Sequence, residues 1–532
     1  MDQAAILRSI DPKAWRRQAD VPLDRNGPVG VACEAPPANF LKRPIYAWFE
    51  QQTRRDPAAT ALVDPSTRLS YAETHVRALD LARRIATCVP PGGAVAIWLP
   101  SNVLLPVAIL GCLAAGRTAL VLNHRNPASR IAALVADAAP SAIVHPDAPG
   151  YRDVVPSGVR GIAWDGAAPS HDPPAWGADA AVGPDEPAIV LYTSGSTGLP
   201  KGIVLTQRGI LCRIRQVIAA WHMNRADRFL SLSTPPTIPG LTGCLASLLV
   251  GCTQLTGDLL DDGIKPIVAM ARREGTTIMV GLPALLGGMA ELSGDHGALA
   301  NLRIARTTGD ALMSDALQEW WKLLPPSCHI MTTFGSTEMY TFAQWFVPRE
   351  FEADEMRLPV GYPLPDHEFQ VVDEAWQPVA VGEVGELVLR SRHIALGEWQ
   401  QGHCVPGRFI RDGSQRILLT GDLIRERPDG MVSFVGRRDA QVKVRGQRVE
   451  PAEIERQLLA CPGVNDAAVV AETKDDDTVL RGFVVSRRDA AALLAALASA
   501  LPAYMVPASL TIVASLPRLP SGKVDRQALL AE

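Results

Sequence analysis

A loop of small hydroxylated residues and glycine joins two apolar, β-branched runs near residue 190. The run from Ile189 leads into the loop, and a lysine precedes the second run; the candidate phosphate-binding residues are Thr193, Ser194, Gly195, Ser196, Thr197, Gly198 and Lys201. Glycines let backbone N–H groups turn toward an anion, hydroxyls donate hydrogen bonds, and the lysine adds a cation. Because Leu-Pro follows Gly198, the loop differs from the Walker A pattern. Two flanking strands and a Pro-Lys-Gly ending argue against a flexible linker, so we predict a phosphate-binding loop.

A second group of residues with suitable chemistry runs from Phe334 through Gly335 to Thr337 and Glu338. The carboxylate offers a hard oxygen ligand of the kind that Mg²⁺ prefers, and the aromatic ring offers a π-face to a planar group. Taken alone, Gly-Ser-Thr-Glu also fits the capped start of a helix.

Two later motifs carry side chains that could bind polar ligands. Asp422, in Thr-Gly-Asp, presents two oxygens that can accept hydrogen bonds from a cis-diol. Lys523, in Ser-Gly-Lys, carries a compact charge on a long side chain. Between them, a charged segment that contains Arg437 and Asp439 predicts a hairpin leading into a helix. Alone, the first motif would be an ordinary turn and the second an exposed lysine.

In this order, the motifs resemble those of the acyl-adenylate-forming (AMP-binding) superfamily, from about Ile45 to Leu530. The resemblance implies that the loop ending at Lys201 embraces the β- and γ-phosphates of ATP and that Phe334, before Gly335, lies against adenine. It also implies that Asp422 binds the ribose hydroxyls and that Arg437 reaches the nucleotide.

The resemblance further implies the catalytic residues and the reaction. Thr337 would contact the α-phosphate, Glu338 would help to hold Mg²⁺, and Lys523 would neutralise charge as a carboxylate attacks that phosphate. Pyrophosphate leaves, the small C-terminal domain turns about a hinge at Asp439, and a pantetheine thiol takes the acyl group. The implied cofactors are ATP and Mg²⁺.

The late motifs are closest to freestanding adenylation domains of nonribosomal peptide synthetases. Since the chain ends six residues after Arg526, we expect it to act in trans on an acyl or peptidyl carrier protein. The alternatives are an acyl- or aryl-CoA ligase that uses free coenzyme A, and a non-catalytic nucleotide-binding paralogue. Lys201, Glu338, Asp422 and Lys523 argue against the paralogue.

The acid substrate is predicted from a missing carboxylate. The resemblance places Ile238 where amino-acid-activating relatives have an aspartate for the substrate ammonium, and no Asp or Glu lies between Asp227 and Asp258. A buried ammonium without a carboxylate would be costly, so we predict an acid without an α-amino group. The other pocket residues implied by the resemblance are Pro239, Thr242, Gly281, Arg306, Thr308, Thr333, Thr341 and Phe342. Arg306 could bind a second anionic or polar group, or could be a surface arginine after a strand.

The elements that must position these residues alternate between helix and strand. Helices expected at 71–86 and 131–136 alternate with strands expected at 94–99 and 141–144, which is typical of an α/β fold with mostly parallel sheets. Residues 145–185 are rich in Pro, Gly, Asp and Ala and predict a connecting loop. Short strands after Gly361 predict a β-rich subdomain, and the last hundred residues predict a small, mobile α+β domain. The expected division is an N-terminal arm at 1–40, a large domain at 41–437 and a C-terminal lid domain at 438–532.

The composition sets the broad class of the protein. A net charge of −4 argues against nucleic-acid binding. The scattered cysteines predict reduced thiols, and the N-terminus lacks the apolar core of a secretory signal. The apolar stretch Val103 to Leu122 is broken by Pro106, Gly111 and Arg117, so we expect a core helix running into a strand rather than a membrane span. These features predict a cytoplasmic protein.

Overall fold

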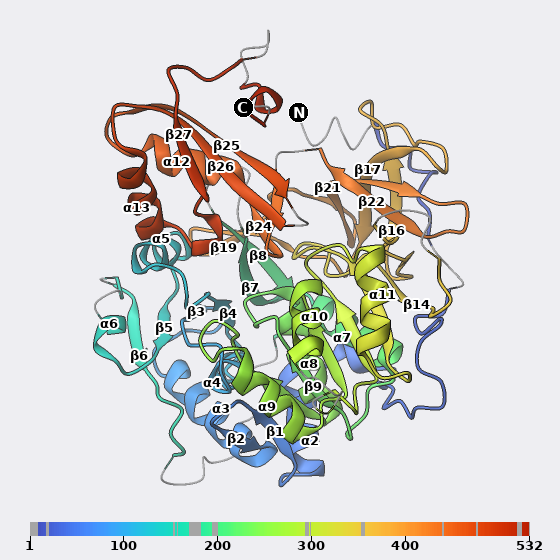
Figure 1. The fold of residues 1–532 in the computed structure, drawn as a ribbon. Helices are drawn as coiled ribbons and strands as arrows, with labels where there is room; N and C mark the ends of the chain where they lie inside the picture. The colour runs from blue at the N-terminus through green and yellow to red at the C-terminus, as the bar shows by residue number, and fades with distance from the viewer. Residues whose placement is uncertain are drawn as a thin grey trace.

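The computed structural model describes residues 9–17, 21–152, 155–156, 158–169, 182–193, 200–292, 297, 299–352, 357–438, 441–474, 477–518 and 524–530. The predicted α/β class is confirmed: two large, parallel-rich sheets are accompanied by a β-rich unit and a small C-terminal α+β unit (Figure 1).

A nine-stranded sheet provides the edge on which most of the predicted acid-pocket residues lie. Its order is β15 (Tyr362–Pro363), β14 (Ala343–Val347), β13 (His329–Phe334), β12 (Ile304–Thr307), β11 (Ile278–Gly281), β9 (Arg228–Ser231), β10 (Thr253–Thr256), β1 (Thr60–Val63) and β2 (Arg68–Ser70). The pairs from β13 through β1 are all parallel. The carboxyl ends of β11, β12 and β13 therefore meet at one edge, which is where α/β sheets place ligands.

An eight-stranded sheet contains the two strands that flank the predicted phosphate-binding loop. Its order is β19 (His403–Val405), β18 (Gly397–Gln400), β8 (Lys201–Thr206), β7 (Pro187–Thr193), β4 (Thr118–Val121), β3 (Ala94–Ile97), β5 (Ala142–His145) and β6 (Arg160–Ala163). The expectation that 145–185 is entirely a connecting loop is wrong, because β6 and the short helix α6 (Pro149–Arg152) lie within it. The weakly apolar β6 gains its stability from parallel pairing with β5 at the sheet edge.

Helices cover the two sheets and follow the predicted alternation. They are α2 (Ile45–Arg55), α3 (Tyr71–Ala86), α4 (Leu104–Ala114), α5 (Ala128–Ala138), α7 (Gln207–Trp221), α8 (Ile238–Val250), α9 (Ile264–Glu274), α10 (Pro283–Leu292) and α11 (Ser314–Leu323). The α3 helix begins as predicted because Ser70 and Glu73 form a reciprocal capping box. The apolar stretch after Val103 forms the buried helix α4 and then β4. Within the described residues, no helix is long and apolar enough to cross a membrane.

The β-rich unit contains β16 (Glu368–Val372), β17 (Val384–Ser391), β20 (Phe409–Asp412), β21 (Gln415–Glu426) and β22 (Val432–Arg437). The N-terminal segment lies against it, since the backbone N–H of Arg16 donates to the carbonyl of Phe369 over 3.1 Å. Residues 21–39 contain no helix or strand.

The C-terminal unit has its own apolar core. It contains β23 (Val442–Val444), β24 (Gln447–Val449), α12 (Pro451–Leu459), β25 (Val464–Lys474), β26 (Asp477–Ser486), α13 (Ala490–Ala500), β27 (Ser509–Ile512) and α14 (Arg526–Leu530). Figure 1 shows it, in orange and red, at the carboxyl-terminal end of the chain, beside α5. Arg130 of α5 forms a 2.5 Å ion pair with Glu453, and Ser129 donates to the carbonyl of Ser499. The predicted boundary at 437/438 falls in the connection between β22 and β23.

Candidate active site

The predicted phosphate-binding loop connects two neighbouring antiparallel strands. Thr193 ends β7, Lys201 begins β8, and the two residues are cross-strand partners. The Lys201 ammonium lies 3.8 Å from Glu398, which in turn lies 3.7 Å from Arg408. The predicted residues Ser194, Gly195, Ser196, Thr197 and Gly198 lie outside the described part of the chain.

The segment that begins at Phe334 lies at the carboxyl edge of the nine-stranded sheet. Phe334 is buried, and its ring lies 5.2 Å from that of Phe434 on β22. A side chain at Gly335 would place its Cβ 2.0 Å from the carbonyl oxygen of Tyr340, so only glycine permits this turn. The half-buried Thr337 lies in a turn that leads back to β14. The helix-cap interpretation is therefore wrong: the tight return between antiparallel β13 and β14 leaves no room for a helix here.

Glu338 is a buried carboxylate that is held by two arginines. Arg448 of β24 donates to both carboxylate oxygens, over 2.7 and 2.9 Å, and Arg408 lies 3.7 Å away. Burial by itself would raise the pKa of Glu338, but these guanidinium groups outweigh it and lower the pKa to about 2. Glu338 could offer hard oxygen ligands to Mg²⁺, although in this arrangement Arg448 holds both oxygens.

Asp422 is a second buried carboxylate paired with arginine. It lies on β21 opposite Arg437 of β22, and the two side chains form an ion pair. Arg437 also donates to the carbonyl of Thr420 over 3.2 Å. Burial raises the pKa of Asp422 above its ordinary value, although Arg437 favours the ionised form. The two residues predicted to bind the nucleotide therefore bind each other in this arrangement.

The hairpin of β23 and β24 brings the C-terminal unit to this edge. Its two-residue turn, Arg445 and Gly446, has positive φ at both positions, as in the turns that match the twist of a hairpin. A Cβ on Gly446 would lie 2.0 Å from the side chain of Leu282, directly after β11. The tip therefore packs on the edge that holds the acid pocket. Two predicted residues, the hinge Asp439 and the catalytic Lys523, lie outside the described residues.

Most of the predicted pocket residues lie at the same sheet edge. Gly281 ends β11, Arg306 and Thr308 are at the end of β12, Thr333 is on β13, Thr341 and Phe342 precede β14, and Ile238, Pro239 and Thr242 are in the first turns of α8. The N–H of Thr308 donates to the carbonyl of Gly281 over 3.0 Å, and Arg306 donates to Thr333 over 3.0 Å.

Packing connects Arg306 to α8. Its guanidinium lies 5.7 Å from the ring centroid of Trp221, which stacks on Phe229 at 5.9 Å. A Cβ on Gly243 of α8 would lie 2.6 Å from the same phenyl ring. Arg306 is only 4% exposed, so the interpretation as a surface arginine is wrong: its strand lies inside the sheet, and Trp221 of α7 lies against its guanidinium.

Sequence reasoning missed a second buried arginine, Arg213 of α7, which is 2% exposed. It donates to the side-chain oxygens of Gln216, over 3.3 Å, and Gln344, over 3.2 Å. Its position at helical spacing from the buried Ile210 and Val217 was the available signal, because that spacing places Arg213 on the apolar face of α7.

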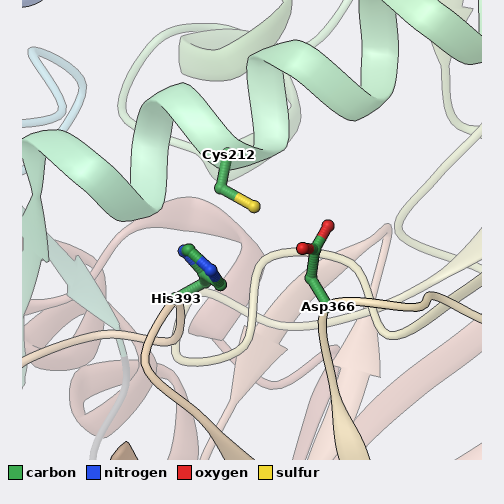
Figure 2. Close-up of side chains that lie close together, drawn as sticks. All are labelled: Cys212, Asp366 and His393. Atoms are coloured by element: carbon green, nitrogen blue, oxygen red, sulfur yellow. The ribbon is translucent and has the colours of Figure 1, made fainter. Parts of the chain in front are cut away.

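Next to this arginine, Cys212 of α7 faces Asp366 and His393, which lie before β16 and after β17 (Figure 2). Asp366 already accepts hydrogen bonds from Arg215 at 3.1 Å and Gln216 at 2.9 Å. Burial raises the pKa of Cys212 and lowers that of His393 to about 4. A protonated thiol and an engaged carboxylate are poor metal ligands, so the cluster supports α7 by packing and hydrogen bonding.

Comparisons with known proteins identify the family. The chain matches the AMP-binding enzyme family over residues 49–399 and the AMP-binding enzyme C-terminal domain over residues 453–523. It is 31% identical over 504 residues to malpibaldin synthetase of Mortierella alpina, covering 92% of this chain but 9% of that protein. It is also 31% identical over 511 residues to a dimodular nonribosomal peptide synthase of Bacillus subtilis, covering 91% of this chain and 21% of that protein. The chain therefore spans only a small part of each of these relatives.

Two solved structures illustrate the shared fold. An o-succinylbenzoate CoA synthetase from Bacillus subtilis aligns with a TM-score of 0.78 and 21% identity, covering 92% of this chain and 99% of that one. A malonyl-CoA ligase with methylmalonyl-CoA and AMP bound aligns with a TM-score of 0.72 and 26% identity, covering 87% and 98%. The predicted resemblance is confirmed, and this chain belongs to the AMP-binding enzyme family, as an acyl-adenylate-forming ligase that uses ATP.

Proposed function

We propose that this protein activates a carboxylic acid with MgATP, releases pyrophosphate and transfers the acyl group to the phosphopantetheine thiol of a separate carrier protein. The observation that carries the proposal is a chain of charges across the site. Lys201 lies 3.8 Å from Glu398, Glu398 lies 3.7 Å from Arg408, and Arg408 lies 3.7 Å from Glu338. It joins the phosphate-binding loop to the proposed metal carboxylate.

The proposed residues act by positioning and by electrostatics, and no protein nucleophile is required. Phe334 faces the base, Asp422 accepts hydrogen bonds from the ribose hydroxyls, and Thr337 donates to the α-phosphate. Magnesium, when bound, would neutralise phosphate charge beside Glu338 once Arg448 has left its oxygens. Lys523 supplies the cation that balances charge as the acid attacks.

The hairpin contact at Gly446 supports a second step in which the C-terminal unit approaches the acid pocket. In the proposal, this unit turns about Asp439 between the two half-reactions. Lys523 then lies at the site during adenylation, and the hairpin lies there during thioester formation. Relatives such as the dimodular nonribosomal peptide synthase favour a carrier protein as the thiol donor, whereas the likeness to the malonyl-CoA ligase favours coenzyme A as the alternative.

We propose an acid without a free α-amino group. The first turn of α8 contains Ile238 and Pro239, and its N-terminal cap is the hydroxyl of Thr237. No carboxylate of this helix is available to an ammonium group, because none is present in its sequence.

The test is pyrophosphate exchange with a panel of α-amino, aryl, keto, aliphatic and dicarboxylic acids, without a thiol acceptor. Exchange with acids that lack an amino group, lost in a Lys523→Ala variant, would support adenylation. Exchange with α-amino acids alone would contradict the proposed substrate class. No pyrophosphate exchange with any acid of the panel, with ATP shown to bind, would favour the non-catalytic paralogue.

The acceptor requires a separate measurement. Enzyme that has formed adenylate is mixed with holo carrier protein or with coenzyme A, and thioester formation is followed over time. Faster transfer to coenzyme A at low KM would replace the carrier protein with coenzyme A in the proposal.

A further inference from the structure

We propose that the acid activated by this enzyme carries a second carboxylate, which is bound by the guanidinium groups of Arg213 and Arg306. The inference rests on the proposed function, because it names the class of acid for that reaction. The enzyme would then be selective for dicarboxylic acids.

Both arginines are buried without a counter-charge. Arg213 is 2% exposed and Arg306 is 4% exposed, yet neither forms an ion pair with any residue that the structure describes. By contrast, the nearby Arg303 is held by Asp227 at 2.7 Å. A buried charge is costly unless it is paired, so the protein tolerates two unpaired guanidinium groups here only at a cost in stability.

Each guanidinium also has an N–H group without an acceptor. Arg306 uses Nη2 to bond Thr333, and its buried Nε has no partner among the described residues. Arg213 uses Nη1 to bond two glutamine side chains, and its buried Nη2 likewise meets no acceptor in that part of the chain. A guanidinium carries five N–H donors in a planar fork, which matches the two oxygens of a carboxylate.

The sheet brings the two groups together. The acceptor of Arg306 is Thr333 on β13, and an acceptor of Arg213 is Gln344 on β14; these two residues are direct cross-strand partners. Cross-strand partners project from the same face of a sheet, about 5 Å apart at their Cβ atoms. The two guanidinium groups therefore reach adjacent positions on one face, and the charge of Arg306 adds to burial in lowering the pKa of Arg213.

The position suits the far end of a substrate. Thr333, which bonds Arg306, directly precedes Phe334, so the arginine is bound next to the motif proposed to hold the nucleotide. An acid with its reacting carboxylate near Thr337 could place a second carboxylate toward Arg306. The surrounding Trp221 ring adds a cation–π contact to the same guanidinium and holds it on this face.

The direct test compares dicarboxylic acids of three to six carbons with their monomethyl esters and with monocarboxylic acids of equal length. Pyrophosphate exchange by the wild-type enzyme should favour the best diacid over its monoester by about 30-fold or more in kcat/KM. In Arg306→Gln and Arg213→Gln, kcat/KM for that diacid should fall by about 30-fold or more, while the monoester stays within about threefold. A wild-type enzyme that uses monoesters or monoacids as well as diacids would overturn the inference.

A thermal-unfolding experiment separates this role from a structural one. Without substrate, Arg306→Gln should unfold at the same temperature as wild type or higher, because an unpaired buried charge is removed. A clear fall in that temperature would mark a structural arginine and would count against the inference. The matched control is Arg54→Gln, since Arg54 is 74% exposed at its side chain and far from this pocket in sequence.

Pyrophosphate exchange and thermal unfolding, taken together, distinguish failure of the inference from failure of the proposed function. If no acid supports exchange but the diacid still raises the unfolding temperature of wild type and not of Arg306→Gln, the pocket assignment holds and the proposed reaction fails. If monoacids support exchange and diacids neither react nor stabilise, the reaction holds and the assignment fails.

Discussion

The proposed nucleotide site and the proposed acid pocket both bury charged side chains, but among the described residues only the nucleotide site pairs them. Glu338 is held by Arg448 and Asp422 by Arg437, whereas Arg213 and Arg306 form no ion pair among the described residues. A buried pair is close to neutral in its effect on stability, while an isolated buried charge is expensive.

The difference in charge pairing indicates which charged group each site is expected to bind. At the nucleotide site, the cation on Glu338 comes from the C-terminal hairpin, so a movement of that unit can exchange it for another cation. At the proposed acid pocket, the described residues supply no anion to the two arginines, and in our proposal the substrate brings one. In this view the nucleotide site can exchange its cation, whereas the acid pocket selects the substrate by its charge.

Replacing Glu338 with Gln should have the largest effect. The substitution removes a proposed metal-binding oxygen and the carboxylate that Arg448 contacts, whereas Arg408 still has Glu398 nearby, so pyrophosphate exchange should fall by about 100-fold or more. Stability should also fall, by about 3 kcal/mol, which is opposite in sign to the effect of Arg306→Gln. Exchange kinetics and thermal unfolding measure the two effects. If both variants change stability in the same direction, the contrast between the sites is wrong.

Replacing Asp422 with Asn should weaken nucleotide binding more than it slows chemistry. Hydrogen bonds to a charged group are worth about 1.5–3 kcal/mol, so KM for ATP should rise by about 10- to 100-fold with little change in kcat. The control nucleotide is 2′-deoxyadenosine triphosphate, which wild type should use less well than ATP and the variant should use about as well as ATP. Equal sensitivity of both proteins to the missing hydroxyl would contradict the ribose assignment.

Replacing Arg448 with Gln should separate the two half-reactions. The contact of Arg448 Nη1 with both carboxylate oxygens of Glu338, which holds the hairpin there, is lost, while residues proposed for adenylation remain. Thioester formation should fall by about tenfold, and pyrophosphate exchange should be unchanged or faster. The two rates are measured on one preparation. A parallel loss of both rates would show that Arg448 serves adenylation directly.

The smallest predicted effect concerns pH. His367 is buried, which lowers its pKa to about 4, so the unfolded chain binds more protons than the folded protein below pH 6.5. Its contribution to stability is therefore complete above pH 6.5 and is lost progressively as pH falls toward 4. Unfolding of His367→Gln should show a shallower loss over this range. An identical slope in both proteins would contradict the assignment.

The same histidine can sharpen the comparison between the sites. Burial lowers the pKa of His367, Asp366 and the hydrogen bond to the Thr341 carbonyl raise it, and the charge of Arg213 lowers it further. A carboxylate bound by Arg213 should therefore raise that pKa, whereas a bound monoester should not. Titration of the His367 ring by NMR, with each ligand at saturation, measures the difference.

Much of the fold was predictable because its signals are local. The helices at Tyr71–Ala86 and Ala490–Ala500 follow from apolar periodicity and capping residues, and the α/β class follows from the alternation of elements. The position of β6 was not predictable, because a short strand at a sheet edge depends on the neighbour that pairs with it. The helix-cap interpretation of Gly335 to Glu338 was wrong for a similar reason, since the chain must reverse within a few residues so that β14 can pair antiparallel with β13.

The sequence by itself determined the family, the order of the nucleotide motifs and the absence of an acidic anchor in α8, because residue type and spacing within one segment carry that chemistry. Only the tertiary structure decided that Arg306 is buried, that Arg213 bonds Gln344 on β14 and that Arg448 holds Glu338. Those facts join residues that are far apart in the chain. They depend on sheet register and on the docking of the C-terminal unit, so no local pattern of residues could reveal them.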